Sequence, residues 1–359
     1  MNNLARVPQI LKAEAELRRS TVWRAYHIFY GGNPLTVLSD CIIPLAERLK
    51  VEGLIIEYFY INYWVEGSHV RLRLRANGCS QRLIEDIDVA VCEEVGSYLR
   101  SFPSYHPMAE LANHNFYETL FVGEFTDADR PRYFHTDGSP IFARNNSIEI
   151  RPYEPEWGRY GGEIGMLIAE RYFVDSTQFA VSLMKLGNLN TRTILLGLSA
   201  QISYITALCL LKKKDLIENF FRAYYHRWAK GYDTQRNYDS EEGRRRYRQT
   251  VEKLQVQTGL YSHAIAAGLI DGVPEFLRPW VRQCEHTRQR IAAACAEQAL
   301  FFSYDDGERL VTDLDDAAWS FCHSFIHMMN NRITVSVADE AFLAYELYLA
   351  LHEGDDIYE

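Results

Sequence analysis

Two stretches decide the predicted fold: Leu54-Ile55-Ile56-Glu57-Tyr58-Phe59-Tyr60-Ile61-Asn62-Tyr63-Trp64 and His69-Val70-Arg71-Leu72-Arg73-Leu74-Arg75. The first is rich in Ile, Tyr and Phe, which favour strands, and the second alternates strictly between polar and apolar residues. Between them lies Val65-Glu66-Gly67-Ser68, whose glycine and polar residues are typical of a turn. The pattern predicts two strands that form an antiparallel hairpin.

The second strand carries an unusual row of charges. Successive side chains of a strand point to opposite faces, so Val70, Leu72 and Leu74 should face the core while the histidine and the three arginines share the other face. Guanidinium groups two residues apart, roughly 7 Å along a strand, repel one another unless an anion lies among them. Arginine suits such a site because its planar fork binds carboxylates through two hydrogen bonds. The alternative is a solvated outer face paired with acids of neighbouring strands.

The rest of the pattern predicts an α+β fold, with a mixed or antiparallel sheet and packed helices in the N-terminal half and a mostly helical C-terminal half. We expect one domain, residues 1–359, sheet-rich over about 22–160 and helix-rich over about 161–352. Residues 104–145 are expected to hold strands and loops. The predicted strands are Trp23–Tyr30 and Ser147–Tyr153, and the predicted helices are 4–19, Pro34–Leu49, 81–101, 161–173, Glu242–Arg248, Pro274–Ala299, Asp315–Asn331 and Ala338–Leu351.

Composition excludes several classes of protein. Of 359 residues, 47% are hydrophobic, enough for a sizeable core, and the net charge of −10 argues against direct nucleic-acid binding. Ile194–Leu211 is the most apolar stretch, but its Ser, Thr and Gln residues indicate a buried helix and no membrane interaction. Seven cysteines without a Cys-x-x-Cys motif indicate free thiols, and no signal peptide is recognisable at the N-terminus. A cytoplasmic location is therefore expected.

A second chemical segment runs from Glu154 to Gly162. Glu156, Arg159 and Tyr160 precede Gly161-Gly162, which should open a helix. Backbone N–H groups at such a helix start favour anions, and a carboxylate beside an arginine can orient it or accept a proton. The alternative is a helix-capping turn with a local ion pair.

The third segment lies on a predicted helix, where His323, His327 and Asn331 recur every four residues and share one face, with Arg332 following. Two histidines at this spacing can bind zinc, but no His-Glu-x-x-His motif or third ligand follows, so no metal is expected. A histidine can also act as a general acid or base near neutral pH. The alternative is a hydrogen-bonded core histidine.

Taken in order, these segments resemble the C-terminal domain of lantibiotic dehydratases, which also occurs as stand-alone proteins in thiopeptide-type bacteriocin biosynthesis. The matching motifs are Tyr58–Arg73, Tyr153–Gly162, Glu170–Ser176 and His327–Arg332, within about residues 22–350. Asn62 departs from the pattern, because the family often has arginine there, and this removes one anion contact. Residues 200–315 match no motif.

The resemblance implies β-elimination. Elimination-type members remove the α-proton of a glutamylated Ser or Thr and expel glutamate, leaving dehydroalanine or dehydrobutyrine. The positions that match their elimination residues are Arg71, Arg73, Glu156, Arg159 and His327. His327 is the first candidate for the base, and Glu156 is either the second or the residue that orients Arg159. Further substrate-binding candidates are His69, Arg75, Tyr160, Asn331 and Arg332.

Two other functions stay open for the same fold. One is a pyridine synthase, which joins two dehydroalanines in a formal [4+2] cycloaddition with loss of the leader. The other is a non-catalytic scaffold that binds a leader peptide, for which the sheet edge near 54–75 would suit strand addition. For the elimination activity, the expected partners are a precursor peptide and a separate tRNA-dependent glutamylating enzyme. No cofactor is expected, and the sequence leaves a homodimer open.

Overall fold

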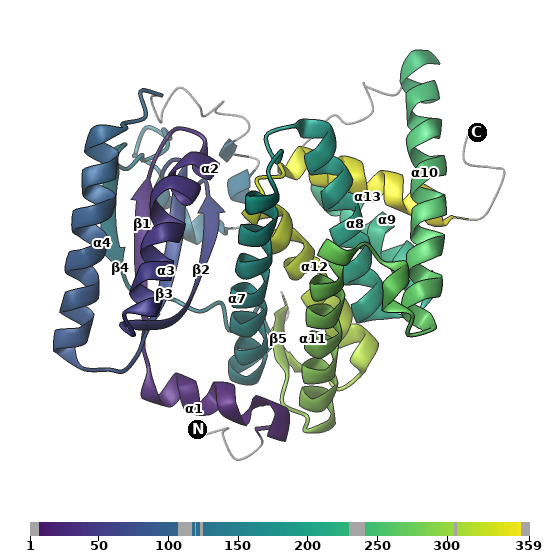
Figure 1. The fold of residues 1–359 in the computed structure, drawn as a ribbon, viewed down its shortest axis with the longest axis horizontal. Coiled ribbons are helices and arrows are strands. Elements are labelled where there is room, and N and C mark those ends of the chain that lie inside the picture. Colours follow the sequence, from purple (N-terminus) through teal and green to yellow (C-terminus); the bar gives the residue numbers. More distant parts are fainter. Residues whose placement is uncertain are drawn as a thin grey trace. The chain divides into compact units, whose positions relative to one another are not determined.

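The computed structural model describes residues 7–106, 117–118, 120–122, 125–229, 241–304 and 307–352 (Figure 1). They confirm the α+β fold, with an antiparallel sheet in the N-terminal half and helices in the C-terminal half. The chain divides into two compact units. One comprises Glu16–Glu154, and the other comprises Met1–Ala15 with Pro155–Glu359. The expectation that residues 1–359 act as a single domain stays a prediction.

The first unit is built on a sheet of four antiparallel strands in the order β2-β3-β1-β4. The predicted hairpin is confirmed, since β2 pairs with β3 from Tyr63 opposite His69 down to Ile55 opposite Ala76. β3 also pairs with β1, so the arginine strand lies inside the sheet. The strands are β1 (Trp23–Phe29), β2 (Ile55–Tyr63), β3 (His69–Ala76) and β4 (Ser147–Arg151).

One face of this sheet packs against helices α3 (Ile43–Val51) and α4 (Gln81–Ser101) (Figure 1). Val70, Leu72 and Leu74 lie on this face and are buried, as the alternation predicted. On the same face, the guanidinium of Arg24 in β1 pairs with Asp88 of α4. The other face therefore carries the arginines of β3.

Residues Pro34–Val51 form one helical stretch, as predicted, but with a wider turn inside it. The stretch consists of α2 (Pro34–Val37), a π-helical segment Leu38–Ile42, and α3. Pro44 follows that segment and has no N–H to donate to a carbonyl four residues earlier. The missing donor gives the local reason for the wider turn.

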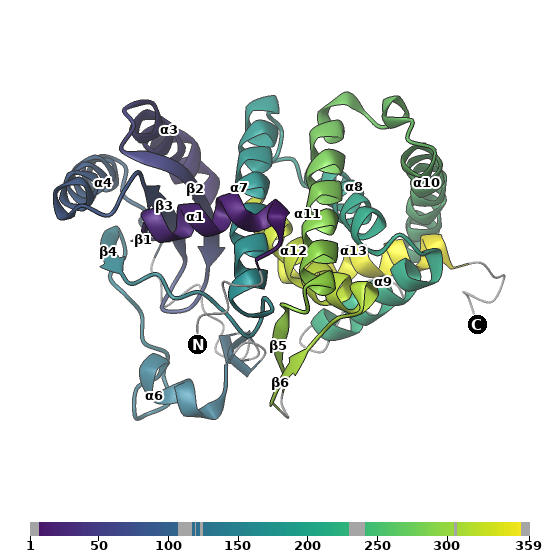
Figure 2. The same cartoon turned by 90° about the horizontal axis from the view of Figure 1, so that it is seen from below.

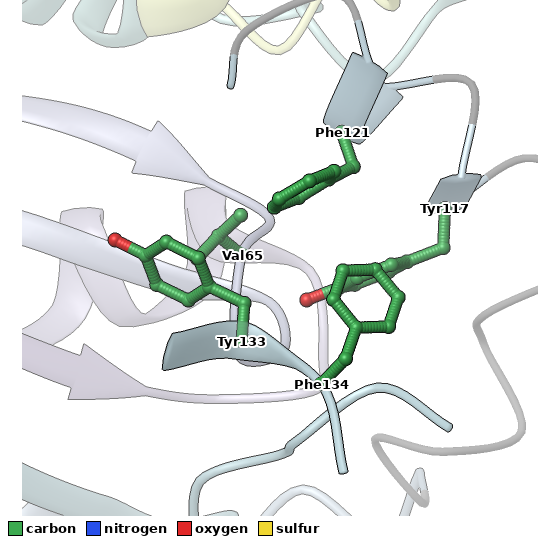
Figure 3. Close-up of a cluster of buried hydrophobic side chains, with 5 residues drawn as sticks. All are labelled: Val65, Tyr117, Phe121, Tyr133 and Phe134. Carbon is green, nitrogen blue, oxygen red and sulfur yellow. The ribbon is translucent and has the colours of Figure 1, made fainter. Parts of the chain in front are cut away.

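The prediction of strands in residues 104–145 is wrong for the part that the structure describes. The residues there form short helices, including α6 (Arg130–Tyr133), and a single isolated bridge between Phe134 and Pro140. Aromatic side chains take the place of strand pairing: Figure 3 shows Tyr117, Phe121, Tyr133 and Phe134 gathered around Val65 in a buried cluster. This cluster packs against the tip of the β2–β3 hairpin and holds its turn.

The second unit is a layered set of helices (Figure 2). Helices α11 and α12 contact each other and each contacts α7 and α8, and α13 packs on α8, α9 and α10. Of the described residues, α8 alone is long and apolar enough to cross a membrane, and 67% of its most apolar window is buried inside the protein, as predicted for a core helix. The helices are α7 (Gly162–Leu186), α8 (Arg192–Leu211), α9 (Lys214–Ala229), α10 (Glu241–Ala266), α11 (Arg278–Ala296), α12 (Leu314–Arg332) and α13 (Val337–Leu351), and the boundary between the units falls within α1 (Lys12–Ser20).

A hairpin in this half was not predicted, but one is present. β5 (Phe301–Tyr304) and β6 (Gly307–Leu310) pair antiparallel and project from the helices (Figure 2). On its other side, β5 bonds to the turn before α7, through Phe301 N–H to Gly161 O at 3.0 Å and Ser303 N–H to Gly158 O at 2.9 Å. The hairpin therefore supports the turn that carries Arg159.

Candidate functional site

The sheet face opposite α3 and α4 is strongly cationic. Registered pairing places Arg71 beside His27, and Arg151 beside Ala25, which in turn lies beside Arg73. Arg75 lies one pair further along the same face. We call this surface, with Arg71, Arg73, Arg75 and Arg151, the cationic face. The alternative prediction of a solvent-exposed strand face is wrong at two of these positions, because Arg73 is 7% exposed and Arg75 is 4% exposed.

Two of the four arginines are paired with acids. Arg75 Nε lies 2.9 Å from Glu57 Oε1 on the neighbouring strand, and its guanidinium lies 4.3 Å from the centre of the Trp23 ring. Arg151 binds Glu66 at 2.6 Å and Glu149 at 2.5 Å. These pairs neutralise both charges, so Arg75 stabilises the sheet through its contacts with Glu57 and Trp23.

Arg71 and Arg73 have no carboxylate partner among the described residues. Arg73 donates to the Leu72 carbonyl at 3.3 Å and lies 3.4 Å from His27 Nε2. Arg71 stacks on Tyr63, 3.3 Å from the ring centre, and its Nε donates to His69 Nε2 at 3.4 Å. A buried guanidinium without an acid is costly, and an anion bound beside it would offset that cost.

The titration of the neighbouring groups reflects this excess of positive charge. Burial, followed by the nearby arginines, lowers the pKa of His69 to about 3 and holds the pKa of His27 far below its usual range. Burial and the charge of Arg71 lower the pKa of Arg73 to about 9. Both histidines are therefore neutral at pH 7, and His69 can accept from Arg71 while its Nδ1–H donates to the Gly67 carbonyl at 2.8 Å. Among the described residues, no carboxylate forms an ion pair with Arg71 or Arg73, although the charge of Glu154 partly offsets the lowering of the pKa of Arg73.

In the second unit, the turn before α7 holds Arg159 in place. Its NH1 donates to Glu156 at 3.1 Å, and its Nε donates to Ser324 Oγ of α12 at 3.1 Å. Gly161 ends the turn with a φ of 80°, which disfavours a side chain, and a Cβ there would lie 3.0 Å from the Phe302 ring. The expected ion pair between Glu156 and Arg159 is present, and Arg159 is also tied to the histidine helix.

His327 is oriented by a buried acid that the sequence analysis did not identify. Its Nδ1 lies 2.9 Å from Oε1 of Glu340 in α13, and the Tyr224 hydroxyl donates to the other carboxylate oxygen. Since both oxygens of Glu340 accept, Nδ1 carries the hydrogen and Nε2 is left to accept a proton. The Trp228 ring lies 4.9 Å from the imidazole and covers it. This arrangement suits a general base whose tautomer is fixed.

The remaining helix positions lie in different environments. His323 is half-buried with its Nε2 atom shielded from solvent, and desolvation lowers its pKa well below 6.5, so it is neutral. Arg332 is fully buried and donates to Thr177 at 3.0 Å and to the Met328 carbonyl at 2.7 Å. Asn331 is half-buried, and Tyr160 is buried with its ring stacked on Phe325. These contacts give Arg332 and Tyr160 packing roles here, and substrate binding by either stays a prediction.

Within the described ranges, no three His, Cys, Asp or Glu side chains are grouped so that they could hold a metal ion. The two units thus divide the predicted residues. Glu16–Glu154 carries His69, Arg71, Arg73 and Arg75, and the other unit carries Glu156, Arg159, Tyr160, His327, Asn331 and Arg332.

Sequence reasoning missed Glu340, Tyr224 and Trp228. Glu340 lies on a helix whose other buried residues are mostly apolar, and an acid in such a position was a signal that could have been used. The partner of that acid was not readable, because the contact depends on how α12, α13 and α9 pack.

The chain belongs to the family described as the lantibiotic biosynthesis dehydratase C-terminal domain, whose model matches residues 23–351. This confirms the resemblance stated from the motifs and assigns the chain to the biosynthesis of ribosomally made peptides. No curated protein sequence matches the chain.

Solved structures share the fold at low sequence identity. The pyridine synthase TbtD from thiomuracin biosynthesis is 16% identical with a TM-score of 0.67, over 91% of this chain and 97% of TbtD. TsrL is 16% identical with a TM-score of 0.59, over 92% of this chain and 94% of TsrL. The tRNA-dependent lantibiotic dehydratase MibB from Microbispora sp. 107891 is 16% identical with a TM-score of 0.50, over 91% of this chain but 28% of MibB.

Proposed function

We propose that this protein eliminates glutamate from glutamylated Ser and Thr residues of a ribosomally made peptide, giving dehydroalanine or dehydrobutyrine. The observation that carries the proposal is that, among the described residues, Arg71 and Arg73 form no ion pair with a carboxylate, whereas Arg75 and Arg151 do. Two arginines of this sheet are neutralised by acids, and two have no carboxylate partner among the described residues. The second pair is therefore suited to bind an anion.

The leaving group supplies such an anion. Glutamate joined to the peptide through one carboxyl group keeps its second carboxylate, and that group can bind Arg71 and Arg73 through paired hydrogen bonds. A second negative charge develops on the ester oxygen as the bond to Cβ breaks. Preorganised cations in a buried setting stabilise such a charge because they need little rearrangement.

The proton step is assigned to His327. Its Nε2 takes the α-proton, the C–H electron pair forms the double bond to Cβ, and the Cβ–O bond breaks so that glutamate leaves as a carboxylate. Glu340 keeps the proton on Nδ1 throughout and stabilises the imidazolium that forms. Arg159, fixed by Glu156 and Ser324, is assigned to hold the carbonyl that becomes enolate-like.

The proposal also names partners. A chain that only eliminates glutamate needs a peptide glutamylated elsewhere, so a separate tRNA-dependent enzyme and the precursor peptide are its partners, in the cytoplasm. The second candidate function is pyridine synthesis, favoured by the fold shared with TbtD over 97% of that chain.

Two parallel incubations followed by mass spectrometry distinguish these functions. The first uses a glutamylated precursor peptide, and the second uses the same peptide with its serines already converted to dehydroalanine. We expect loss of glutamate in the first and no change in the second. A macrocycle with loss of the leader in the second, and no glutamate release in the first, would establish pyridine synthesis instead.

A further inference from the structure

The outer edge of strand β6 is not paired with another strand of the described residues. Within the described ranges β6 pairs with β5 alone, and all four of its residues are exposed. In an antiparallel pair, the residues alternate between those that bond to the partner strand and those whose N–H and C=O point away from it. The bond from Val311 N–H to Leu300 O at 2.9 Å fixes this alternation for the hairpin.

By that alternation, Glu308 and Leu310 direct their backbone groups outward. The opposite strand supports this assignment, because the residues across from them, Ser303 and Phe301, turn their N–H groups away from β6 and bond to the turn at Gly158 and Gly161. Among the described residues, no hydrogen bond is recorded for the backbone of Glu308 or Leu310 on the free side. The edge therefore offers two donors and two acceptors in strand spacing.

A cavity of about 540 Å³ is lined by Glu308 of β6 and by Phe301 of β5, and a long side chain of a strand added to β6 would reach it across Glu308. Phe301 and Glu308 contribute to it from the same face of the hairpin. The other contributing residues come from the start of α7 and from the segment before β5: Trp157, Gly162, Glu163, Ile164, Gln298 and Ala299.

The two carboxylates that line the cavity favour a positively charged side chain. Glu163 and Glu308 are its only ionisable lining residues, and neither has an ion-pair partner in the part of the chain that the structure describes. The Trp157 and Phe301 rings line the same space, and aromatic faces attract cations. A lysine or arginine side chain matches two unpaired carboxylates and two rings, whereas an acidic side chain would be repelled.

We propose that β6 and this cavity, together the β6 subsite, bind an extended segment of the substrate peptide with a basic side chain in the cavity. The inference deepens the proposed function, because it takes the occupant of the subsite to be the peptide that is modified. Strand addition gives affinity through the backbone, and the cavity gives specificity at one side chain. The cavity is also lined by Trp157 and Gly162, which flank the turn that carries Arg159, and β5 lies between this turn and the edge of β6.

A labelled decapeptide tests the β6 subsite. The probe alternates Thr and Val around one central Lys and carries fluorescein, and its binding to the full chain is followed by fluorescence anisotropy. Replacing the central Lys by Glu should weaken binding at least about tenfold, because attraction becomes repulsion. Methylation of alternate backbone nitrogens should abolish binding, because the added strand loses its donors. Equal affinity of the Lys and Glu probes, or of the methylated probe, would overturn the proposal.

Protein variants give the matching half of the test. Glu308→Gln and Glu163→Gln should each weaken the Lys probe about two- to fivefold, and the exposed, distant Glu275→Gln should leave it unchanged. Equal effects of all three variants would contradict the charge argument. Leu310→Pro removes one outward N–H without removing a bond to β5, so it should also weaken the probe. If the chain instead forms a dimer in sedimentation that Leu310→Pro abolishes, and no probe binds, then a second copy occupies the edge and the proposal is overturned.

Glutamate release, measured in parallel on a glutamylated precursor, separates this inference from the proposed function. Charge-selective probe binding without release would refute the elimination activity and keep the β6 subsite. Release without charge-selective binding would refute the β6 subsite alone.

Discussion

The cationic face differs from the His327 group, which consists of His327, Glu340, Tyr224 and Trp228, in whether its buried charges are paired. On the sheet, Arg73 is buried with no carboxylate partner among the described residues, and its pKa is lowered to about 9 by burial and by Arg71. On the helices, His327 meets a buried carboxylate at 2.9 Å, and a tyrosine hydroxyl binds the same carboxylate. The first arrangement leaves room for an anion to complete it, whereas the second is complete and fixes one nitrogen for proton transfer.

The largest expected effect is on the His327 group. His327→Ala should slow glutamate release from a pre-glutamylated peptide by about 10²- to 10⁴-fold, the usual contribution of a general base. His352→Ala is the matched control, because His352 also pairs with a glutamate, Glu218, at 2.6 Å. Release is measured by mass spectrometry over time. Wild-type release by the His327 variant would remove this histidine from the mechanism.

The two buried arginines of β3 should respond to substitution with opposite signs. Arg75→Met removes the cation that pairs with the buried Glu57, so it should lower the free energy of unfolding by about 3–5 kcal/mol. Arg73→Met removes an unpaired buried charge, so it should leave the free energy of unfolding unchanged or raise it by about 1 kcal/mol. Urea denaturation followed by circular dichroism checks both. An equal loss of stability in the two variants would mean that Arg73 is neutralised like Arg75.

The carboxylate behind His327 should matter less than the histidine itself. Glu340→Gln keeps the size of the side chain but presents one carbonyl and one NH₂ group, so the tautomer of His327 is no longer fixed. We expect release to slow by about 10²-fold with substrate affinity retained. Glu218→Gln, which alters the pair with His352, is the control. A Glu340 variant as fast as the wild type would show that the pair only packs the helices.

The smallest expected effect tests a buried acid that belongs neither to the cationic face nor to the contacts of His327. Glu346 of α13 is buried with no hydrogen bond or ion pair among the described residues, and burial raises its pKa to about 8. Because the folded pKa lies above the unfolded value, this group costs stability as pH rises from about 4.5 to about 8. Glu346→Gln should therefore raise the free energy of unfolding on the order of 2 kcal/mol at pH 9 and change little at pH 4. Equal effects at both pH values would contradict the assignment.

Much of the fold was predictable because it follows local periodicity. The hairpin of β2 and β3, helix α4 and helix α12 all repeat their patterns over enough residues to fix element type and approximate ends. The β5–β6 hairpin was missed because each strand has only four residues within an otherwise helical half. The absence of strands in the described part of 104–145 depends on aromatic packing against the β2–β3 turn, which is not a periodic signal.

The candidate site was predictable as residue types but not as partners. The alternation of β3 placed three arginines on one face, yet it could not tell Arg75 from Arg73. That difference depends on the strand register, because Glu57 lies opposite Arg75, next to an irregularity in the β2–β3 pairing. A register shift of one residue would move Glu57 to the other face of the sheet. Similarly, the motif identified His327, but Glu340 lies on a separate helix and joins it only through tertiary packing.

The central claim is that Arg73 binds the free carboxylate of the glutamate leaving group, and one cycle of rates tests it directly. Glutamate release is measured with wild type and Arg73→Met, each acting on the glutamyl ester and on the matched ester whose free carboxylate is a carboxamide. We predict that the carboxamide slows the wild type at least about 100-fold but slows Arg73→Met by less than about threefold, because the ionic contact is already lost. Equal slowing of both proteins by the carboxamide would contradict the claim.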